Sequence, residues 1–153
     1  MTLSDYIENI SNQLSTTVTY EEGKEWEVNL ELDNIETFPV LYFRNYLSAT
    51  YTRDRAGRIL YADYPITIEI MSKQNYLDDT TSNLDDTIFN SLTLLANEFI
   101  ARVYASSEYQ TPANQVSNQV YNLLAFRDKY DVIVAGIQLT TTLRLYLGED
   151  SCF

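Results

Sequence analysis

The apolar positions at the start of the chain recur every three or four residues, as they do along one face of an α-helix. The residues that form this stripe are Leu3, Ile7, Ile10 and Leu14. We therefore predict a helix over residues 2–14, capped by Thr2 or Ser4, with Asp5 near the positive end of the helix dipole. A single apolar stripe indicates that this helix docks on the rest of the protein through one face.

Alternating apolar and polar positions, which are typical of half-buried strands, occur in the later sequence. Together with an apolar stretch that begins at Pro39, they predict strands at residues 26–33, 39–46, 66–71 and 137–147. The strand at 26–33 would have one apolar and one acidic face. The strand at 137–147 is the longest and most regular, so we expect it to lie in the centre of its sheet.

A two-stranded ribbon is predicted between the second and third of these strands. Its strands cover residues 47–53 and 58–64. Asp54-Arg55-Ala56-Gly57 forms the hairpin loop, in which glycine supplies a positive φ. Few large aliphatic residues lie near the loop, so the ribbon is expected to project from the core. Pro65 is expected to end the ribbon, because proline cannot donate a hydrogen bond to a neighbouring strand.

Two more helices are predicted in the second half of the chain. The longer one begins at Ser82 or Asn83, which would cap it, and runs to about Ala105. Its apolar positions step by three or four residues and are Leu84, Ile88, Leu92, Leu95, Phe99 and Val103. A shorter helix is predicted at residues 116–127, from Val116, Val120, Leu123 and Leu124.

This order of elements predicts an α+β fold in a single domain of residues 1–153. We expect a mostly antiparallel sheet with an extended hairpin, an N-terminal helix, and one long helix packed on one face. Residues 148–153 are expected to form a flexible tail.

The composition argues against most kinds of enzyme. The chain has no histidine, which is the commonest general base and zinc ligand, and only four glycines from which to build a phosphate-binding loop. The single cysteine, Cys152, cannot form an internal disulfide. No secretory signal and no membrane-spanning run is found. We expect a soluble, intracellular protein that is not an enzyme, with no cofactor and no metal.

Two pairs of adjacent carboxylates are candidate sites of chemistry. These pairs are Asp78-Asp79, in a predicted polar loop, and Asp85-Asp86, at the predicted start of the long helix. Their placement is explained by solvation and by the helix dipole. Asp78, Asp79 and Asp85 could gather a divalent cation such as Mg²⁺, but they do not follow the EF-hand pattern and lack its glycine.

Charge is distributed unevenly along this strongly acidic chain. The formal net charge is −12, yet three of the arginines form a cluster around the hairpin loop, which we name the basic finger: Arg53, Arg55 and Arg58. These arginines could be ordinary solvated charges or could contact nucleic acid, against which the net charge argues. We favour a third interpretation, in which the finger of one copy binds the acidic strand face of another. The acids of that face are Glu25, Glu27, Glu31 and Asp33.

The layout of the elements resembles that of small neck proteins of tailed bacteriophages, of the tail-terminator and head–tail joining type. The stretches that carry the resemblance span most of the chain and are TLSDYIENISNQL, YADYPITIEIM, LDDTIFNSLTLLANEFIARV and VAGIQLTTTLRLYL. The bias towards Tyr, Asn, Asp and Thr is also similar to that of proteins from crAss-like phages.

This resemblance implies a structural virion protein without enzymatic activity. It would form a hexameric or dodecameric ring in the neck, where it would join the portal or adaptor to the tail. DNA would pass through the ring without specific binding, and the chain would be found in the virion and, during assembly, in the host cytoplasm. Candidates to line the channel are Asp78, Asp79, Asp85 and Asp86.

Two other classes of function stay open at this point. An acidic inhibitor that mimics DNA would spread carboxylates over an exposed surface. A monomeric adaptor would expose one apolar patch to its partner.

Overall fold

The computed structural model describes residues 2–23, 39–44, 48–73, 82–106, 121–127 and 134–146. Over these residues the protein has two helices and one six-stranded sheet. The helices are α1 (Leu3–Asn12) and α3 (Ser82–Ala105). The strands are β1 (Thr19–Gly23), β2 (Val40–Arg44), β3 (Thr50–Arg53), β4 (Ile59–Lys73), β5 (Asn122–Arg127) and β6 (Val134–Tyr146).

Helix α1 is held at its start by a reciprocal pair of hydrogen bonds. The backbone N–H of Asp5 donates to Thr2 Oγ1 at 3.1 Å, and the backbone N–H of Thr2 donates to Asp5 Oδ2 at 2.9 Å. These hydrogen bonds from Thr2 lower the pKa of Asp5. Thr2 is therefore the cap residue, as one of the two sequence alternatives proposed.

The strands of the sheet lie in the order β1-β2-β4-β6-β5, and β3 pairs with the first part of β4. All neighbouring strands are antiparallel except β1 and β2, which are parallel. Strand β6 pairs with β4 on one side and β5 on the other, so the prediction that the C-terminal strand is central is confirmed. The predicted α+β class is confirmed too.

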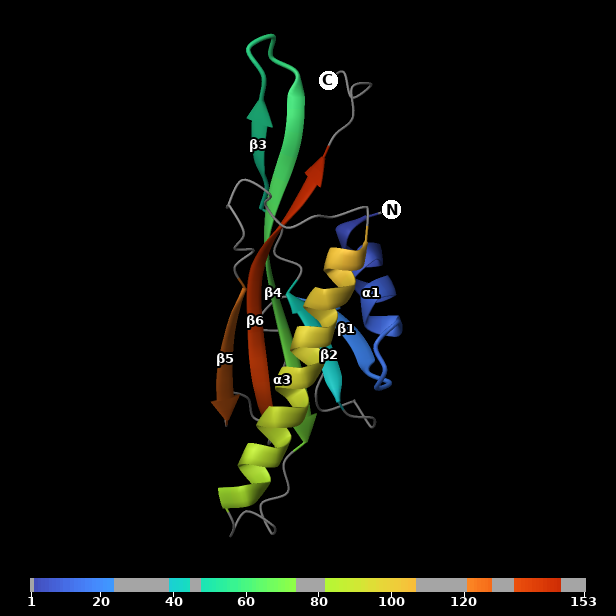
Figure 1. Ribbon diagram of the computed structural model, residues 1–153, viewed down its shortest axis with the longest axis vertical. Helices are drawn as coiled ribbons and strands as arrows, with labels where there is room; N and C mark the ends of the chain where they lie inside the picture. Colours follow the sequence, from blue (N-terminus) through green and yellow to red (C-terminus); the bar gives the residue numbers. More distant parts are fainter. Residues whose placement is uncertain are drawn as a thin grey trace.

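Both helices cover the same face of this sheet, and the hydrophobic core lies between the two layers (Figure 1). Of the side chains predicted from the apolar spacing of α3, Leu92, Leu95, Phe99 and Val103 are buried in the core and Ile88 packs against it. The side chain of Leu84 lies outside the described part of the structure. Both predicted cap residues, Ser82 and Asn83, lie inside its first turn. The sheet contributes alternate residues, among them Phe43, Ile66, Ile68, Ile70, Leu139 and Leu143.

The prediction that Pro65 separates two strands is wrong, because a single strand, the 15-residue β4, runs through Pro65. On one side of β4, residues 61–73 pair with β6. On the other side, β3 pairs with residues 59–63 and β2 pairs with residues 67–71. On this second side, neither β3 nor β2 pairs with Pro65. Proline has no backbone N–H to donate. It is tolerated at such a position because no hydrogen bond between neighbouring strands is lost there.

The short helix predicted at residues 116–127 is also wrong where it can be checked, because residues 122–127 form strand β5. The apolar residues Leu123 and Leu124 suit either type of element, and pairing with β6 decides in favour of the strand. Residues 116–120 lie outside the described residues.

Strand β1 was not predicted from the sequence. Its segment, TYEEG, has little apolar character, and its pairing partner β2 lies in a separate part of the chain. The strand predicted at residues 26–33 and the tail at 148–153 lie outside the described residues.

Candidate functional site

The predicted ribbon forms a projecting hairpin, residues 50–63, which we name the arm. Figure 1 shows the arm extending beyond the ends of the helices at one end of the long axis of the protein. At its tip the backbone N–H of Gly57 donates to the carbonyl of Asp54 at 3.0 Å, and that of Asp54 donates to the carbonyl of Arg58 at 2.9 Å. Gly57 has a φ of 83°, a value that glycine adopts without strain.

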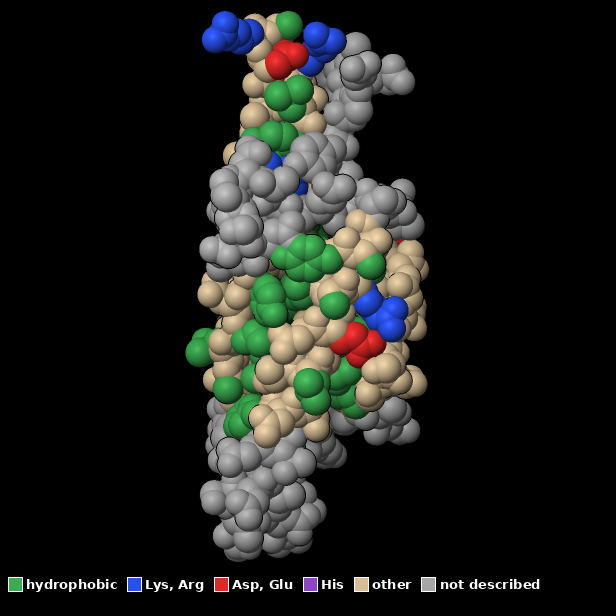
Figure 2. Space-filling model, in the orientation of Figure 1, with side chains coloured by type: hydrophobic (Ala, Val, Ile, Leu, Met, Phe, Trp, Pro, Cys, Tyr) green, Lys and Arg blue, Asp and Glu red, His purple; other side chains and the backbone are tan. Residues whose placement is uncertain are grey.

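The structure brings the three arginines of the basic finger together at this tip. Arg53, Arg55 and Arg58 are all exposed. Figure 2 shows blue side chains on both sides of the tip, with an acidic group between them. Arg58 Nε lies 3.3 Å from Asp54 Oδ2, whereas Arg53 and Arg55 have no ion-pair partner among the described residues. The tip is therefore a small cationic surface with two free guanidinium groups.

The base of the arm is fixed by an ion pair that sequence reasoning did not find. Arg144, on β6, donates from Nε and Nη2 to the two carboxylate oxygens of Asp63, on β4, at 2.8 and 3.1 Å. Its guanidinium carbon also lies 3.7 Å from the centroid of the Tyr61 ring. Arg144 is only 5% exposed, so water screens these contacts weakly.

This cluster ties the arm to the central strand. Asp63 and Arg144 are paired across β4 and β6, and so are Tyr61 and Tyr146. A two-stranded hairpin is marginally stable by itself, so the third strand and the ion pair hold the start of the arm in one direction. The sequence signal was weak, because Arg144 stands at a polar position of its strand and the register with Asp63 could not be known.

A second ion pair lies on the face of the sheet that is opposite to the helices. Arg44 Nη2, on β2, contacts Glu69 Oε1, on β4, and the Glu69 side chain is completely buried. Tyr42 and Met71, on the same face, are also completely buried. Glu69 stands at a polar position of the alternating strand predicted at residues 66–71, but its side chain does not face water.

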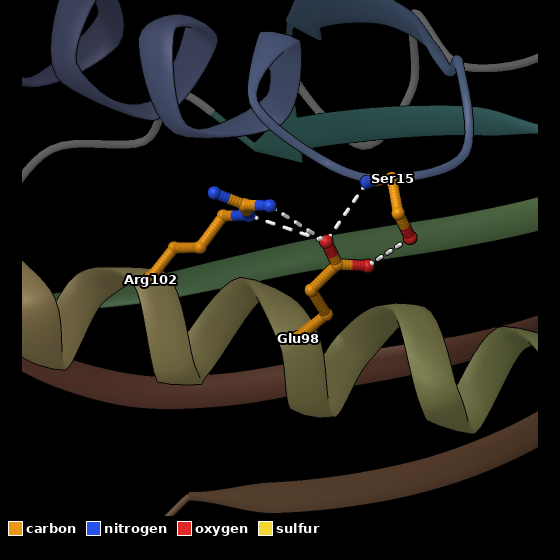
Figure 3. Close-up of polar contacts among 3 residues, drawn as sticks. All are labelled: Ser15, Glu98 and Arg102. Carbon is orange, nitrogen blue, oxygen red and sulfur yellow. Dashed lines mark hydrogen bonds and ion pairs between the residues drawn. The ribbon is translucent and has the colours of Figure 1, made fainter.

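A third polar cluster joins the loop after α1 to α3, as Figure 3 shows. The backbone N–H and the hydroxyl of Ser15 each donate to the Glu98 carboxylate at 2.8 Å. Arg102 donates to Glu98 Oε1 from Nε at 3.2 Å and from Nη2 at 3.1 Å. Hydrogen bonds from Ser15 are the main cause that lowers the pKa of Glu98, and Arg102 adds to the effect.

The acids predicted to bind the basic finger of another copy are not among the described residues. This holds for Glu25, Glu27, Glu31 and Asp33, and also for the channel candidates Asp78 and Asp79. The backbone of Asp85 lies in the first turn of α3 and that of Asp86 directly follows it, but their side chains are not described. Figure 1 shows that this turn lies at the opposite end of the protein from the tip of the arm.

In the described parts of the chain, no group of three or more His, Cys, Asp or Glu side chains is arranged to hold a metal ion. No helix within the described ranges is long and apolar enough to cross a membrane. No protein-family model matches the chain, and no curated protein is significantly similar to it.

Proposed function

We propose that this protein is a structural virion protein that forms a ring in the neck of a tailed bacteriophage. In this role it joins the portal or adaptor to the tail and surrounds the channel through which DNA passes. The observation that carries the proposal is the projecting arm, which places three exposed arginines at the far end of a strongly acidic protein.

The arm is suited to contact another molecule. It extends away from the helices and buries little of its own tip, where the residues from Arg55 to Arg58 are exposed. Its base is held by the ion pair of Asp63 and Arg144. Holding the base in place lowers the entropic cost of positioning the tip on a partner.

Charge favours another copy of the chain as that partner. Each copy carries a net charge of −12 and presents a cationic tip, so the tip of one copy is attracted to acids on the next. A contact between two different surfaces of identical subunits closes into a ring when the rotation between neighbours allows it. Guanidinium groups suit such a contact because each can bind a carboxylate through two hydrogen bonds.

The net acidity also suits the proposed channel. A surface of negative potential repels the DNA backbone, so DNA can move past it without being held. The resemblance to neck proteins supplies the biological setting of the ring, with portal or adaptor and tail proteins as its neighbours.

The test is to reverse the charge of the basic finger. The variant carries Glu at Arg53, Arg55 and Arg58, and a matched control carries Lys at the same three positions. Light scattering and negative-stain imaging of the purified wild type should show closed rings with a central hole. The Glu variant should fail to assemble with an unchanged circular dichroism spectrum, because the three side chains are exposed, whereas the Lys control should retain salt-sensitive assembly.

Two results would contradict the proposal. The first is a wild type that stays monomeric at high concentration, with and without Mg²⁺ and with purified portal as a template. The second is a Glu variant that forms rings as well as the wild type does. A strict monomer would favour an adaptor or an acidic DNA mimic instead.

A further inference from the structure

Charges of opposite sign are separated along this protein. Residues 53–58, at the tip of the arm, contain three arginines and one aspartate and carry a net charge of +2. The rest of the chain, which we name the acidic body, therefore carries −14 of the total of −12. When the basic finger of one copy binds a second copy, an attractive contact forms at the tip while the two acidic bodies repel each other.

The attraction and the repulsion act over different distances. A guanidinium and the carboxylate that it binds lie within about 4 Å of each other, as Arg58 and Asp54 do at 3.3 Å. The arm extends beyond the helices at one end of the protein, so the tip can reach a neighbour while the bodies stay further apart (Figure 1). A chain of this length folds to a diameter of roughly 40 Å, which sets the separation between the centres of two neighbouring bodies.

Dissolved salt weakens these two forces to different extents. The screening length falls from about 30 Å at 0.01 M salt to about 8 Å at 0.15 M. Over this range a repulsion across roughly 40 Å falls more than tenfold, whereas an attraction across about 4 Å falls by roughly a third. Near 1 M the screening length is about 3 Å, and the close attraction falls to roughly a quarter of its unscreened strength. Most of the repulsion is thus lost at low salt and most of the attraction at high salt.

We propose that ionic strength controls assembly through this separation of charge, with an optimum between about 0.1 and 0.3 M salt. Below the optimum the acidic bodies keep the copies apart, and above it the contact made by the basic finger is weakened. The inference rests on the proposed contact between the finger and a second copy. It adds that the surrounding salt decides whether this contact forms.

The charge of the acidic body should set the position of the optimum. Two exposed positions of α3, Asn90 and Ala101, allow this charge to be changed in either direction. Asn90→Lys with Ala101→Lys adds two positive charges and changes the net charge from −12 to −10, whereas Asn90→Glu with Ala101→Glu changes it from −12 to −14. The product of the charges of two copies then differs about twofold between these variants. Lysine and glutamate both have high helix propensity, so α3 should remain folded.

The test measures the assembled fraction by sedimentation velocity, at one protein concentration and in NaCl from about 0.01 to 1 M. For the wild type we expect the assembled fraction to rise severalfold up to the optimum and to fall again by the highest salt. The Lys pair on α3 should move the optimum to lower salt, and the Glu pair should move it to higher salt.

Two controls separate screening from other effects of salt. Choline chloride at the same ionic strength should give the same curve as NaCl, because screening does not depend on the identity of the cation. The variant with Lys at all three finger positions keeps the charge of the tip and of the body. Its optimum should therefore lie where that of the wild type lies.

Several results would overturn the inference. If rings form best at the lowest salt and are steadily lost as salt is added, repulsion between the bodies has no influence, and the proposed ring stands without this control. Assembly that still increases at the highest salt would show that the copies are held by an apolar contact. The inference also fails if the two α3 variants do not shift the optimum in opposite directions, or if choline does not reproduce the effect of Na⁺. A protein that assembles at no salt concentration would overturn both this inference and the proposed function.

Discussion

Replacement of Arg144 by methionine tests whether the ion pair at the base of the arm determines its stability. Methionine keeps most of the length and the apolar stem of the arginine side chain but removes the guanidinium group. The change leaves the Asp63 carboxylate without the two hydrogen bonds of 2.8 and 3.1 Å that it now accepts. It also removes the contact with the Tyr61 ring.

The expected loss follows from how far each partner is buried. Removal of one member of a buried ion pair costs about 3–5 kcal/mol, because the remaining charge is left uncompensated. The Arg144 side chain is 6% exposed, but that of Asp63 is 22% exposed and keeps some contact with water. The lower end of the range therefore applies, and we expect Arg144→Met to lose about 3 kcal/mol. In a chain of this length that lowers the melting temperature by about 6–12 °C.

Urea unfolding followed by circular dichroism measures this loss, and a second variant provides the control. Arg144→Met combined with Asp63→Leu removes both charges, so it should be more stable than Arg144→Met alone. The two single variants and the double variant form a cycle whose coupling energy should exceed about 1 kcal/mol. A single variant that loses less than about 1 kcal/mol, or a double variant whose loss equals the sum of the singles, would refute the reasoning.

Two further predictions concern the body of the protein. Hydrogen bonds from Ser15 lower the pKa of Glu98 below its ordinary value of 4.5. The ionised carboxylate therefore stabilises the folded protein at neutral pH, and this stabilisation is lost as the pH falls from about 4.5 through the lower pKa of the folded state. Glu98→Gln should therefore destabilise the protein at pH 7 and much less at pH 3 in urea titrations, and an equal loss at both would contradict this. A Cβ at Gly136 would lie 2.8 and 2.9 Å from Cε1 and Cε2 of Phe126. Gly136→Ala should cost about 1–3 kcal/mol by urea unfolding, with partial recovery when Phe126→Leu is added, and a neutral single variant would contradict this.

Much of the candidate site could be predicted from local sequence. The hairpin loop was recognisable because aspartate and glycine stand where a tight turn requires them, and the structure gives Gly57 the positive φ that the prediction assigned to it. The position of the basic finger followed directly, because its arginines flank this loop. The ion pair at the base of the arm could not be predicted, since Asp63 and Arg144 lie 81 residues apart.

The sequence by itself determined the elements whose signals are local. The apolar stripes of α1 and α3, the alternation in β4 and β6 and the turn at Gly57 each depend on residues a few positions apart. Helical and strand periodicities differ enough for these long segments to be distinguished.

Only the tertiary structure decided features that depend on which strands become neighbours. Pairing with β6 made residues 122–127 a strand, and pairing with β2 made a strand of the polar segment at 19–23. The gap between β3 and β2 allowed β4 to run through Pro65. The burial of Glu69 beside Arg44 likewise depends on register between separate strands. Short segments have weak conformational preferences of their own, so contacts with distant parts of the chain determine their structure.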